Sequence, residues 1–216
     1  MIVEYFGHSC VRLTASGGTR FVIDPYEGIG YPMPRMRADV VLCTHGHFDH
    51  HNIAGVAGEP KVIESVGSFT CGGVRITGIA SFHDDAGGAK RGKNIIYVLE
   101  DGDTRVCHLG DIGELPRADL LRAIGKVDLL FVPVGGTYTV DAKDALAYIR
   151  ALRPRVAMAI HYRCEGCTLD IDDEQPLLRL AGNRCSRLGG STFDLGAMSR
   201  YMGRIVIAER RRDAGE

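Results

Sequence analysis

The sequence lacks net charge and long apolar runs. Its 216 residues carry 26 basic and 27 acidic side chains, which leaves a formal charge of −1 at pH 7. Such a chain has no overall electrostatic attraction to nucleic acid or to an anionic membrane. It contains no apolar stretch long enough to cross a bilayer, and its first residues lack the features of a signal peptide. We therefore expect neither a membrane nor a nucleic acid as a partner.

Cysteines are present in an odd number, which argues against a disulfide framework. The seven are Cys10, Cys43, Cys71, Cys107, Cys164, Cys167 and Cys185. Without a secretion signal, such a set is typical of a protein kept reduced in the cytoplasm. Cys43, Cys71 and Cys107 lie in apolar, strand-like surroundings, where cysteine packs as a small hydrophobic residue.

A linker or low-complexity segment that would divide the chain is also missing. The length is sufficient for a hydrophobic core that needs no disulfides. We expect a single domain over residues 1–209. The residues from Arg210 to the end, 210–216, should form a solvated C-terminal tail.

Short β-type runs separated by glycine-containing turns dominate the first two thirds of the chain. The predicted strands are 2–6, 11–15, 20–24, 38–44, 61–64, 68–71, 74–80, 94–100, 104–109, 129–134, 156–162 and 204–208. The run 38–44 is almost continuously apolar, as in a strand buried on both faces. Asp101-Gly102 stands between two runs and is a hairpin signal.

Helices are expected in the second half of the chain, at 117–124, 141–152 and 176–180. The second is the clearest, because Asp141 can cap its first turn and Pro154 ends it. Mixed strands with interspersed helices indicate an α/β fold, an αββα sandwich in which two mixed sheets are covered by helices.

The most informative segment is Thr44-His45-Gly46-His47-Phe48-Asp49-His50-His51, which begins at the last residue of the apolar run 38–44. A loop leaving a strand can turn several side chains toward one point. His45 and His47 can share one ion, while Asp49 and His50 reach a second. Imidazole and carboxylate suit Zn, Mn or Fe. The alternative is a histidine-rich surface turn.

Three further candidate ligands stand where apolar runs end. His83 follows the run ending at 82, Asp111 follows the run 104–109, and His161 lies at the end of 156–162. Sheet proteins place their sites at such positions. Each residue alone would be unremarkable, but together they supply the ligands that the first motif lacks for two ions.

The motif His45-x-His47-x-Asp49-His50 resembles the signature of the metallo-β-lactamase superfamily, and the resemblance covers about residues 1–163. Other segments are similar to a small cytoplasmic branch of metal-dependent hydrolases related to ascorbate-6-phosphate lactonases. These segments are Gly7-His8-Ser9, Val22-Ile23-Asp24-Pro25, His83-Asp84, 87–94, His108-Leu109-Gly110-Asp111, 133–139 and His161-Tyr162. The resemblance implies the metallo-β-lactamase αββα sandwich.

The resemblance also implies seven ligands shared between two ions. The first ion is held by His45, His47 and His83, the second by Asp49, His50 and His161, and Asp111 bridges both. Two departures from the branch concern substrate contacts rather than ligands. Glu114 stands near the place of a histidine, and Ala159-Ile160 stands where Pro-Met is common.

Several residues near these motifs have two interpretations. His108 should lie on the opposite strand face from Asp111 and therefore pack or support the ligands. His51 should orient the site or cap the following helix. His8 either faces the pocket or makes a structural hydrogen bond. Asp24 either steadies the metal loop or is an ordinary turn residue.

Contacts to a substrate are predicted from two loops. The loop with Gly136 and Tyr138 can offer backbone N–H groups to an anion, or it is simply a tight turn that needs glycine. Lys90, Arg91 and Lys93 either contact substrate or solvate a loop. We take Gly136, Tyr138 and Lys90 as the candidate substrate-binding residues.

Cys164 and Cys167 follow His161 closely, and we expect them to shape the rim of the pocket. The alternatives are a separate zinc site completed by Cys185 and a redox pair.

The function predicted from these features is hydrolysis of a small ester, lactone or phosphoester, preferably anionic, by a metal-bound hydroxide. Asp49 is the catalytic residue, which orients the nucleophile and accepts its proton. The cofactors are two divalent metal ions, zinc first, with manganese or iron as the other choices. Two alternatives stay open: a non-haem iron redox enzyme of the thiol dioxygenase type on the same fold, and a nucleic-acid phosphodiesterase. A homo-oligomer is also left open.

Overall fold

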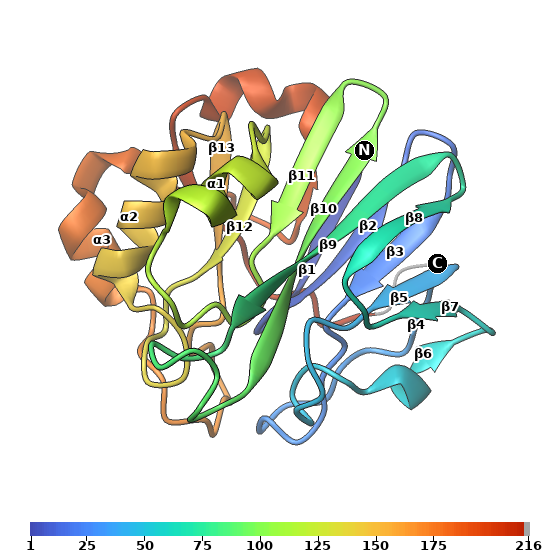
Figure 1. Cartoon of the computed structure of the whole chain (residues 1–216), viewed down its shortest axis with the longest axis horizontal. Coiled ribbons are helices and arrows are strands. Elements are labelled where there is room, and N and C mark those ends of the chain that lie inside the picture. The colour runs from blue at the N-terminus through green and yellow to red at the C-terminus, as the bar shows by residue number, and fades with distance from the viewer. Residues whose placement is uncertain (214–216) are drawn as a thin grey trace.

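Two mixed β-sheets lie face to face at the centre of the computed structural model, which describes residues 1–213 (Figure 1). The six-stranded sheet has the order β15-β1-β2-β3-β5-β7. Its strands are β1 Ile2–Gly7, β2 Cys10–Thr14, β3 Arg20–Ile23, β5 Val40–Leu42, β7 Lys61–Ile63 and β15 Thr192–Asp194. The C-terminal part of the chain thus completes the N-terminal sheet, because β15 pairs antiparallel with β1.

The eight-stranded sheet has the order β14-β16-β13-β12-β11-β10-β9-β8. Its strands are β8 Gly67–Cys71, β9 Val74–Phe82, β10 Lys93–Asp101, β11 Thr104–His108, β12 Leu129–Pro133, β13 Val156–Ile160, β14 Cys185–Arg187 and β16 Ile205–Ile207. The predicted hairpin at Asp101-Gly102 joins β10 to β11, and Gly102 has a φ of 58°. A separate two-stranded pairing joins β4 Met36–Arg37 to β6 Val56–Ala57.

Alternation along the strands separates two hydrophobic clusters. In β1 to β3, Val3, Val11 and Phe21 face the larger sheet and join the main core between the sheets. Phe6 in β1 and Val22 in β3 point to the other face of the same strands and belong to a second cluster. Since side chains alternate between the faces of a strand, one run of apolar residues supplies both layers.

The outer layers differ between the two sheets. Three helices, α1 Ala118–Ile124, α2 Ala142–Leu152 and α3 Gln175–Ala181, cover the outer face of the larger sheet (Figure 1). Asp141 caps α2 as predicted, since its side chain accepts from the backbone N–H of Asp144. The second cluster on the six-stranded sheet is covered by the loop from Tyr26 to Ala38 and by β4 and β6 rather than by an α-helix. Short 3₁₀ helices occupy Ile53–Gly55 (η1), Gly182–Arg184 (η2) and Leu195–Tyr201 (η3).

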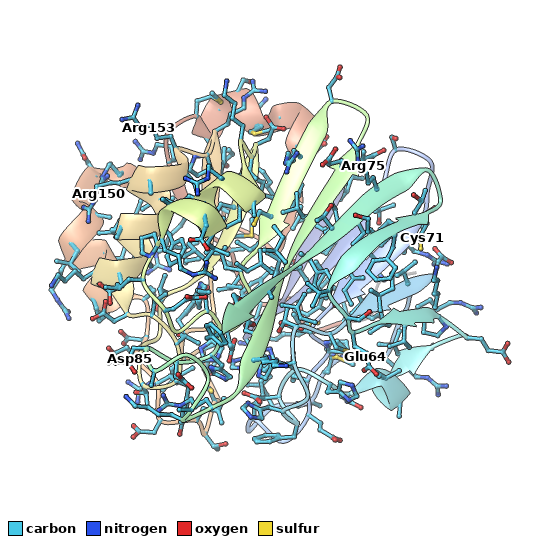
Figure 2. The ribbon with its side chains drawn as sticks, viewed as in Figure 1. Glu64, Cys71, Arg75, Asp85, Arg150 and Arg153 are labelled. Carbon is cyan, nitrogen blue, oxygen red and sulfur yellow. The ribbon has the colours of Figure 1, made fainter. Side chains whose placement is uncertain are left out.

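The fold agrees with the predicted α/β sandwich of two mixed sheets, and charged side chains such as Arg75, Arg150 and Arg153 lie at its periphery (Figure 2). In the expected C-terminal tail, Arg211 forms an ion pair with Glu4, and the guanidinium carbon of Arg210 lies 3.9 Å from the centroid of the Tyr31 ring. Both side chains are partly exposed, and 214–216 lie outside the described residues.

Among residues 1–213, no helix has both the length and the apolar character needed to cross a membrane.

Candidate metal centre

The predicted site residues follow strands that all end at the same edge of the two sheets. In the six-stranded sheet β1 and β3 both pair antiparallel with β2, and β5 runs parallel to β3. In the larger sheet β9 and β11 both pair antiparallel with β10, and β11, β12 and β13 are parallel. The carboxyl ends of these strands therefore carry the candidate ligands into one region, as is general for sites on parallel strands.

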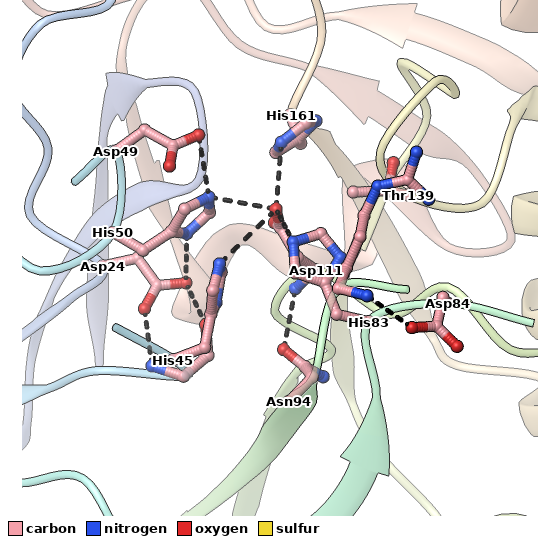
Figure 3. A network of polar contacts seen from close by, with 12 residues as sticks. Asp24, His45, Asp49, His50, His83, Asp84, Asn94, Asp111, Thr139 and His161 are labelled. Atoms are coloured by element: carbon pink, nitrogen blue, oxygen red, sulfur yellow. Dashed lines mark hydrogen bonds and ion pairs between the residues drawn. The ribbon is translucent and has the colours of Figure 1, made fainter. Parts of the chain in front are cut away.

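Asp111 stands at the centre of this region (Figure 3). Its Oδ2 atom faces the Nε2 atoms of four histidines: His50 at 3.1 Å, His161 at 3.2 Å, His83 at 3.4 Å and His45 at 3.9 Å. The four imidazoles come from loops after β5, β9 and β13, so the convergence is tertiary. A carboxylate in this position could be shared by two metal ions, one on each side.

The side chains form three overlapping groups, within each of which the ligand atoms lie no more than 4.8 Å apart. The groups are His45, His47 and His83; His8, Asp49, His50 and His161; and His45, His50 and Asp111. Six of the seven candidate ligands fall into the first two groups, which match the two sets that the resemblance implied, and the third group joins Asp111 to one member of each set. His8, whose position was left open, lies with the second set.

Unpartnered buried atoms in these groups fit a metal. Within residues 1–213, the buried His45 Nε2, His161 Nε2 and Asp111 Oδ1 atoms have no hydrogen-bond partner. Buried polar atoms nearly always have partners, so a cluster of exceptions needs an explanation. Imidazole nitrogens and carboxylate oxygens are the donors that Zn, Mn and Fe accept. The residues present therefore fit divalent ions.

Three of the candidate ligands have charge states that favour ligation, whereas His50 does not. Burial, reinforced by the nearby His161, lowers the pKa of His8 to about 4. Burial and the nearby His50 lower the pKa of His45 to about 3. Both imidazoles are neutral at pH 7, so a lone pair is free on each. Burial opposes ionisation of Asp111, but His161 and His50 outweigh it and hold the pKa of Asp111 well below its usual range. A divalent ion requires these charge states in its ligands. Burial opposes protonation of His50, but Asp111 and Asp24 outweigh it and raise the pKa of His50 well above its usual value, so an ion would have to displace a proton there.

Asp24 supports the second set from behind (Figure 3). The carboxylate is fully buried and accepts three hydrogen bonds: from Thr44 N and Thr44 Oγ1 at 2.8 Å each, and from His50 Nδ1 at 3.0 Å. The bond to Nδ1 fixes the tautomer of His50 and leaves Nε2 as the nitrogen that faces Asp111. Of the two interpretations of Asp24, the structure supports the one in which it steadies the metal loop.

Three buried residues at the site have left-handed backbone conformations. The φ angles are 53° for His8, 52° for Asp24 and 50° for His161, and each residue directly follows a strand or its terminal glycine. Non-glycine residues rarely adopt this conformation, which costs on the order of 1–3 kcal/mol. The sharp turns let chains leaving the sheets point buried side chains at Asp111.

Close backbone approach also positions Asp111. Gly110 has a φ of 58°, and a Cβ atom there would lie 2.4 Å from the side-chain oxygen of Asn94. That oxygen accepts a hydrogen bond from the backbone N–H of Asp111 at 2.9 Å. Only glycine fits at position 110.

The two remaining histidines lie outside the metal groups. His108 is buried, its Nε2 donates to the carbonyl of Ser9 at 3.0 Å, and its Nδ1 accepts from the N–H of Gly110. This agrees with the expected packing role. His51 pairs with Glu64 at 2.8 Å on the surface, while Asn52 caps η1. The expectation that His51 caps the helix is therefore wrong, because the side chain of Asn52 accepts the backbone N–H of Gly55 and caps η1.

A cavity of about 570 Å³ opens directly onto the centre. Its lining residues are Gly46, His47, Phe48, Asp49, His83, Arg91, Asp111, Tyr138 and Leu169. Of the three residues predicted to contact substrate, Tyr138 lies on this cavity. Lys90 and Gly136 line a neighbouring cavity that shares Arg91 and Tyr138 with the first, so their contact with a substrate stays a prediction.

Local contacts hold both residues in place beside the neighbouring cavity. Lys90 is exposed and forms an ion pair with Asp85 at 2.7 Å. Gly136 is in a tight turn with a φ of 61°, and its N–H donates to the carbonyl of Val140. The sequence could not tell Lys90 from Arg91, since the two are adjacent.

Cysteines do not contribute to the metal groups found among residues 1–213. Cys164 and Cys167 are partly buried and unpaired. The N–H of Cys167 donates to the carbonyl of Cys164 at 3.0 Å, which closes a turn. The chain after this turn brings Leu169 to the cavity, consistent with the expectation that the pair shapes the rim.

Comparisons with known proteins agree with this site. The family model described as "Beta-lactamase superfamily domain" matches residues 2–161. A UPF0173 metal-dependent hydrolase from Thermus thermophilus is 32% identical over 189 residues, which cover 74% of this chain and 83% of the relative. A UPF0173 protein from Pyrococcus furiosus is 30% identical over 185 residues, covering 75% and 83%.

Solved structures are similar over almost the whole chain. One is a protein from Thermotoga maritima described as a Zn-dependent hydrolase of the metallo-β-lactamase superfamily. It shares 33% identity and a TM-score of 0.80, covering 96% of this chain and 98% of that one. The metallo hydrolase Igni18 from Ignicoccus hospitalis has the same fold at 19% identity, with a TM-score of 0.67 and coverage of 100% and 96%. The chain belongs to the beta-lactamase superfamily and is one of its metal-dependent hydrolases.

Proposed function

We propose that this protein is a binuclear hydrolase that opens a small ester, lactone or phosphoester bond. The observation that carries the proposal is the position of Asp111, whose Oδ2 atom lies 3.1–3.9 Å from four imidazole nitrogens between two candidate ligand groups. Seven or eight ligands exceed what one ion of this kind takes, since structural and catalytic zinc sites use three or four protein ligands each.

The two ions would be held by the ligands already described, with Asp111 between them. Bound there, they would supply Lewis-acid polarisation of the scissile group and acidification of water. Zinc is our first choice, and the same donors also accept manganese or iron.

Asp49 is the side chain best placed to handle the nucleophile's proton. It lines the cavity, and its Oδ2 atom lies 3.0 Å from His8 Nε2. Burial opposes ionisation of Asp49, but the nearby His50 and His8 outweigh it and hold the pKa of Asp49 below its usual value. The carboxylate is therefore ionised at pH 7 and can orient a water molecule by accepting a hydrogen bond from it. Proton acceptance by Asp49 rests on its place at the cavity, because a lowered pKa makes a carboxylate a weaker base. No serine or cysteine nucleophile is needed.

The cavity supports a small substrate. About 570 Å³ lies within the range of sites for small molecules. Arg91 is the only lysine or arginine that lines it among the described residues, whereas nucleic-acid sites track several phosphates with a row of cations. The unpaired cysteines are consistent with a reducing compartment, and we expect the protein to act in the cytoplasm.

Metal analysis of the purified native protein, followed by a screen of esters, lactones and phosphoesters, tests the proposal. The expected result is about two equivalents of metal and hydrolysis that is lost on chelation and restored by zinc or manganese. Oxygen uptake that depends on iron, without hydrolysis, would favour a non-haem iron redox enzyme instead.

A further inference from the structure

The part of the cavity wall that is formed by residues other than the candidate ligands has a chemistry of its own. It is made by Phe48, Leu169, Tyr138 and Arg91. Phe48 is 53% exposed and Tyr138 is 36% exposed, although both are large side chains beside a polar centre. Exposed apolar surface next to a site marks a surface that binds a ligand's apolar part.

Arg91 is the single cationic group on this wall. Its Nη2 donates to the carbonyl of Thr137 at 2.9 Å, and its guanidinium carbon lies 5.6 Å from the centroid of the Tyr138 ring. Across residues 1–213, no carboxylate lies within 4.0 Å of its guanidinium. A guanidinium has five N–H donors, so most of them are free for an oxyanion, which arginine can bind with two parallel hydrogen bonds.

The loop that carries Arg91 is fixed by Asp84. The two carboxylate oxygens of Asp84 accept four backbone hydrogen bonds, from Ala86, Gly88, Lys90 and Arg91, at 2.7–2.9 Å. Asp84 directly follows the candidate ligand His83, so the loop is tied to the metal centre. A guanidinium held in this way loses little freedom when a ligand binds.

We propose that Arg91 determines substrate specificity by binding a carboxylate or phosphate that the substrate carries apart from its scissile bond, while Phe48, Leu169 and Tyr138 enclose an apolar body. The substrate class is thus an amphiphilic small anion. This inference rests on the proposed hydrolysis, because it assumes that the scissile bond lies at the metal groups. Lys90, next in the chain, takes no part because it is paired with Asp85 outside the cavity.

Three chromogenic substrates test the inference. They are the p-nitrophenyl half-ester of glutaric acid, the p-nitrophenyl ester of pentanoic acid, which differs by the terminal carboxylate, and a chain-matched ester that ends in a phosphate. The variant is Arg91→Met, and the matched control is Lys90→Met, which removes the same charge one residue away. Thermal melting confirms that both variants are folded.

The wild type should prefer the anionic esters, and Arg91→Met should lower their kcat/KM about 10- to 100-fold, mainly through KM. This is the size of losing hydrogen bonds to a charged group. The pentanoate ester should change less than about twofold, and Lys90→Met should leave all three substrates unchanged. Comparing the glutarate and phosphate esters shows which oxyanion fits. Equal losses for anionic and neutral esters, or an effect of Lys90→Met as large as that of Arg91→Met, would overturn the inference while leaving hydrolysis intact.

If no ester is hydrolysed, the proposed ester hydrolysis is contradicted, and the role of Arg91 is then tested by binding alone. Calorimetry would compare the affinities of two amide analogues, glutaric acid monoanilide and pentananilide. Tighter binding of the anionic analogue by wild type, lost in Arg91→Met, supports the inference. Equal affinities of the two analogues for the wild type refute it.

Discussion

Replacing Asp24 by Asn should weaken one metal site without disturbing the other. The side chain is fully buried, and its Oδ2 atom accepts from both Thr44 Oγ1 and His50 Nδ1. Asparagine has nearly the same shape but only one acceptor oxygen. If that oxygen accepts from the backbone N–H of Thr44, the amide N–H₂ group faces the Nδ1–H of His50, and two donors meet. If the amide is flipped, its N–H₂ group meets the backbone N–H of Thr44 instead.

The expected loss of metal affinity follows from the hydrogen bond between residue 24 and His50 Nδ1. A hydrogen bond to a charged group contributes about 1.5–3 kcal/mol, and loss of a carboxylate behind a liganding histidine typically lowers metal affinity 10- to 100-fold. Since each factor of ten corresponds to about 1.4 kcal/mol, the two estimates agree. We therefore expect the ion at His50, Asp49 and His161 to bind about 10- to 100-fold more weakly.

Competition with a chromophoric zinc chelator measures both affinities. The matched control is Asp128→Asn, because Asp128 precedes β12 and accepts a backbone bond from Arg105 at 2.8 Å but contacts no histidine. The control should keep both affinities. An Asp24→Asn protein that binds two ions as tightly as the wild type would refute the role assigned to the Asp24–His50 pair. Equal weakening of both sites would also contradict it and would point instead to Thr44, whose Oγ1 atom contacts both Asp24 and His45 Nδ1.

Three other changes test the centre. Asp111→Ala should cost the protein about one metal equivalent and nearly all hydrolysis, since the carboxylate faces both ligand sets; full activity with two ions would exclude a bridging role. His8→Asn, which tolerates the left-handed backbone, should weaken only the ion near Asp49 in chelator competition, and an unchanged affinity would make His8 a structural residue. Replacing Cys164 and Cys167 together by Ser should lower the free energy of unfolding by about 1–2 kcal/mol in denaturant titration and leave the metal count unchanged, whereas loss of one zinc equivalent would reveal a separate site.

Strands with a strong apolar pattern were predictable from the sequence, and short polar ones were not. Every predicted strand and helix corresponds to an element of the structure, with ends shifted by a few residues. Four strands were missed: the two-residue strands β4 and β6, and β14 and β15, which read Cys-Ser-Arg and Thr-Phe-Asp. Nothing in three such residues predicts a strand, because they pair only when β16 and β1 present free edges in the folded chain.

The candidate ligands could be grouped from the sequence because a two-ion site would leave a dense local pattern of His and Asp residues. His45 to His50 could be recognised from spacing alone, and the partners followed from their places after apolar runs. His8 carries no such pattern: its neighbours are Gly7 and Ser9, and only the turn at the end of β1 brings it against Asp49. A lone histidine after a strand therefore stays ambiguous until the opposing loop is placed.

The substrate wall was least predictable, because adjacent residues in a loop can differ in the cavities that they line: Arg91 lines both the cavity at the candidate metal centre and the neighbouring one, whereas Lys90 lines only the neighbouring one. Lys90 and Arg91 have the same charge, and no property of the sequence separates them. The path of the loop decides, and that path is set by four N–H groups converging on one carboxylate, Asp84. The candidate metal ligands follow strands of the two sheets, whereas Arg91 lies in a loop whose path depends on Asp84. If the proposed role of Arg91 holds, a change in this loop would alter specificity without altering the candidate metal ligands.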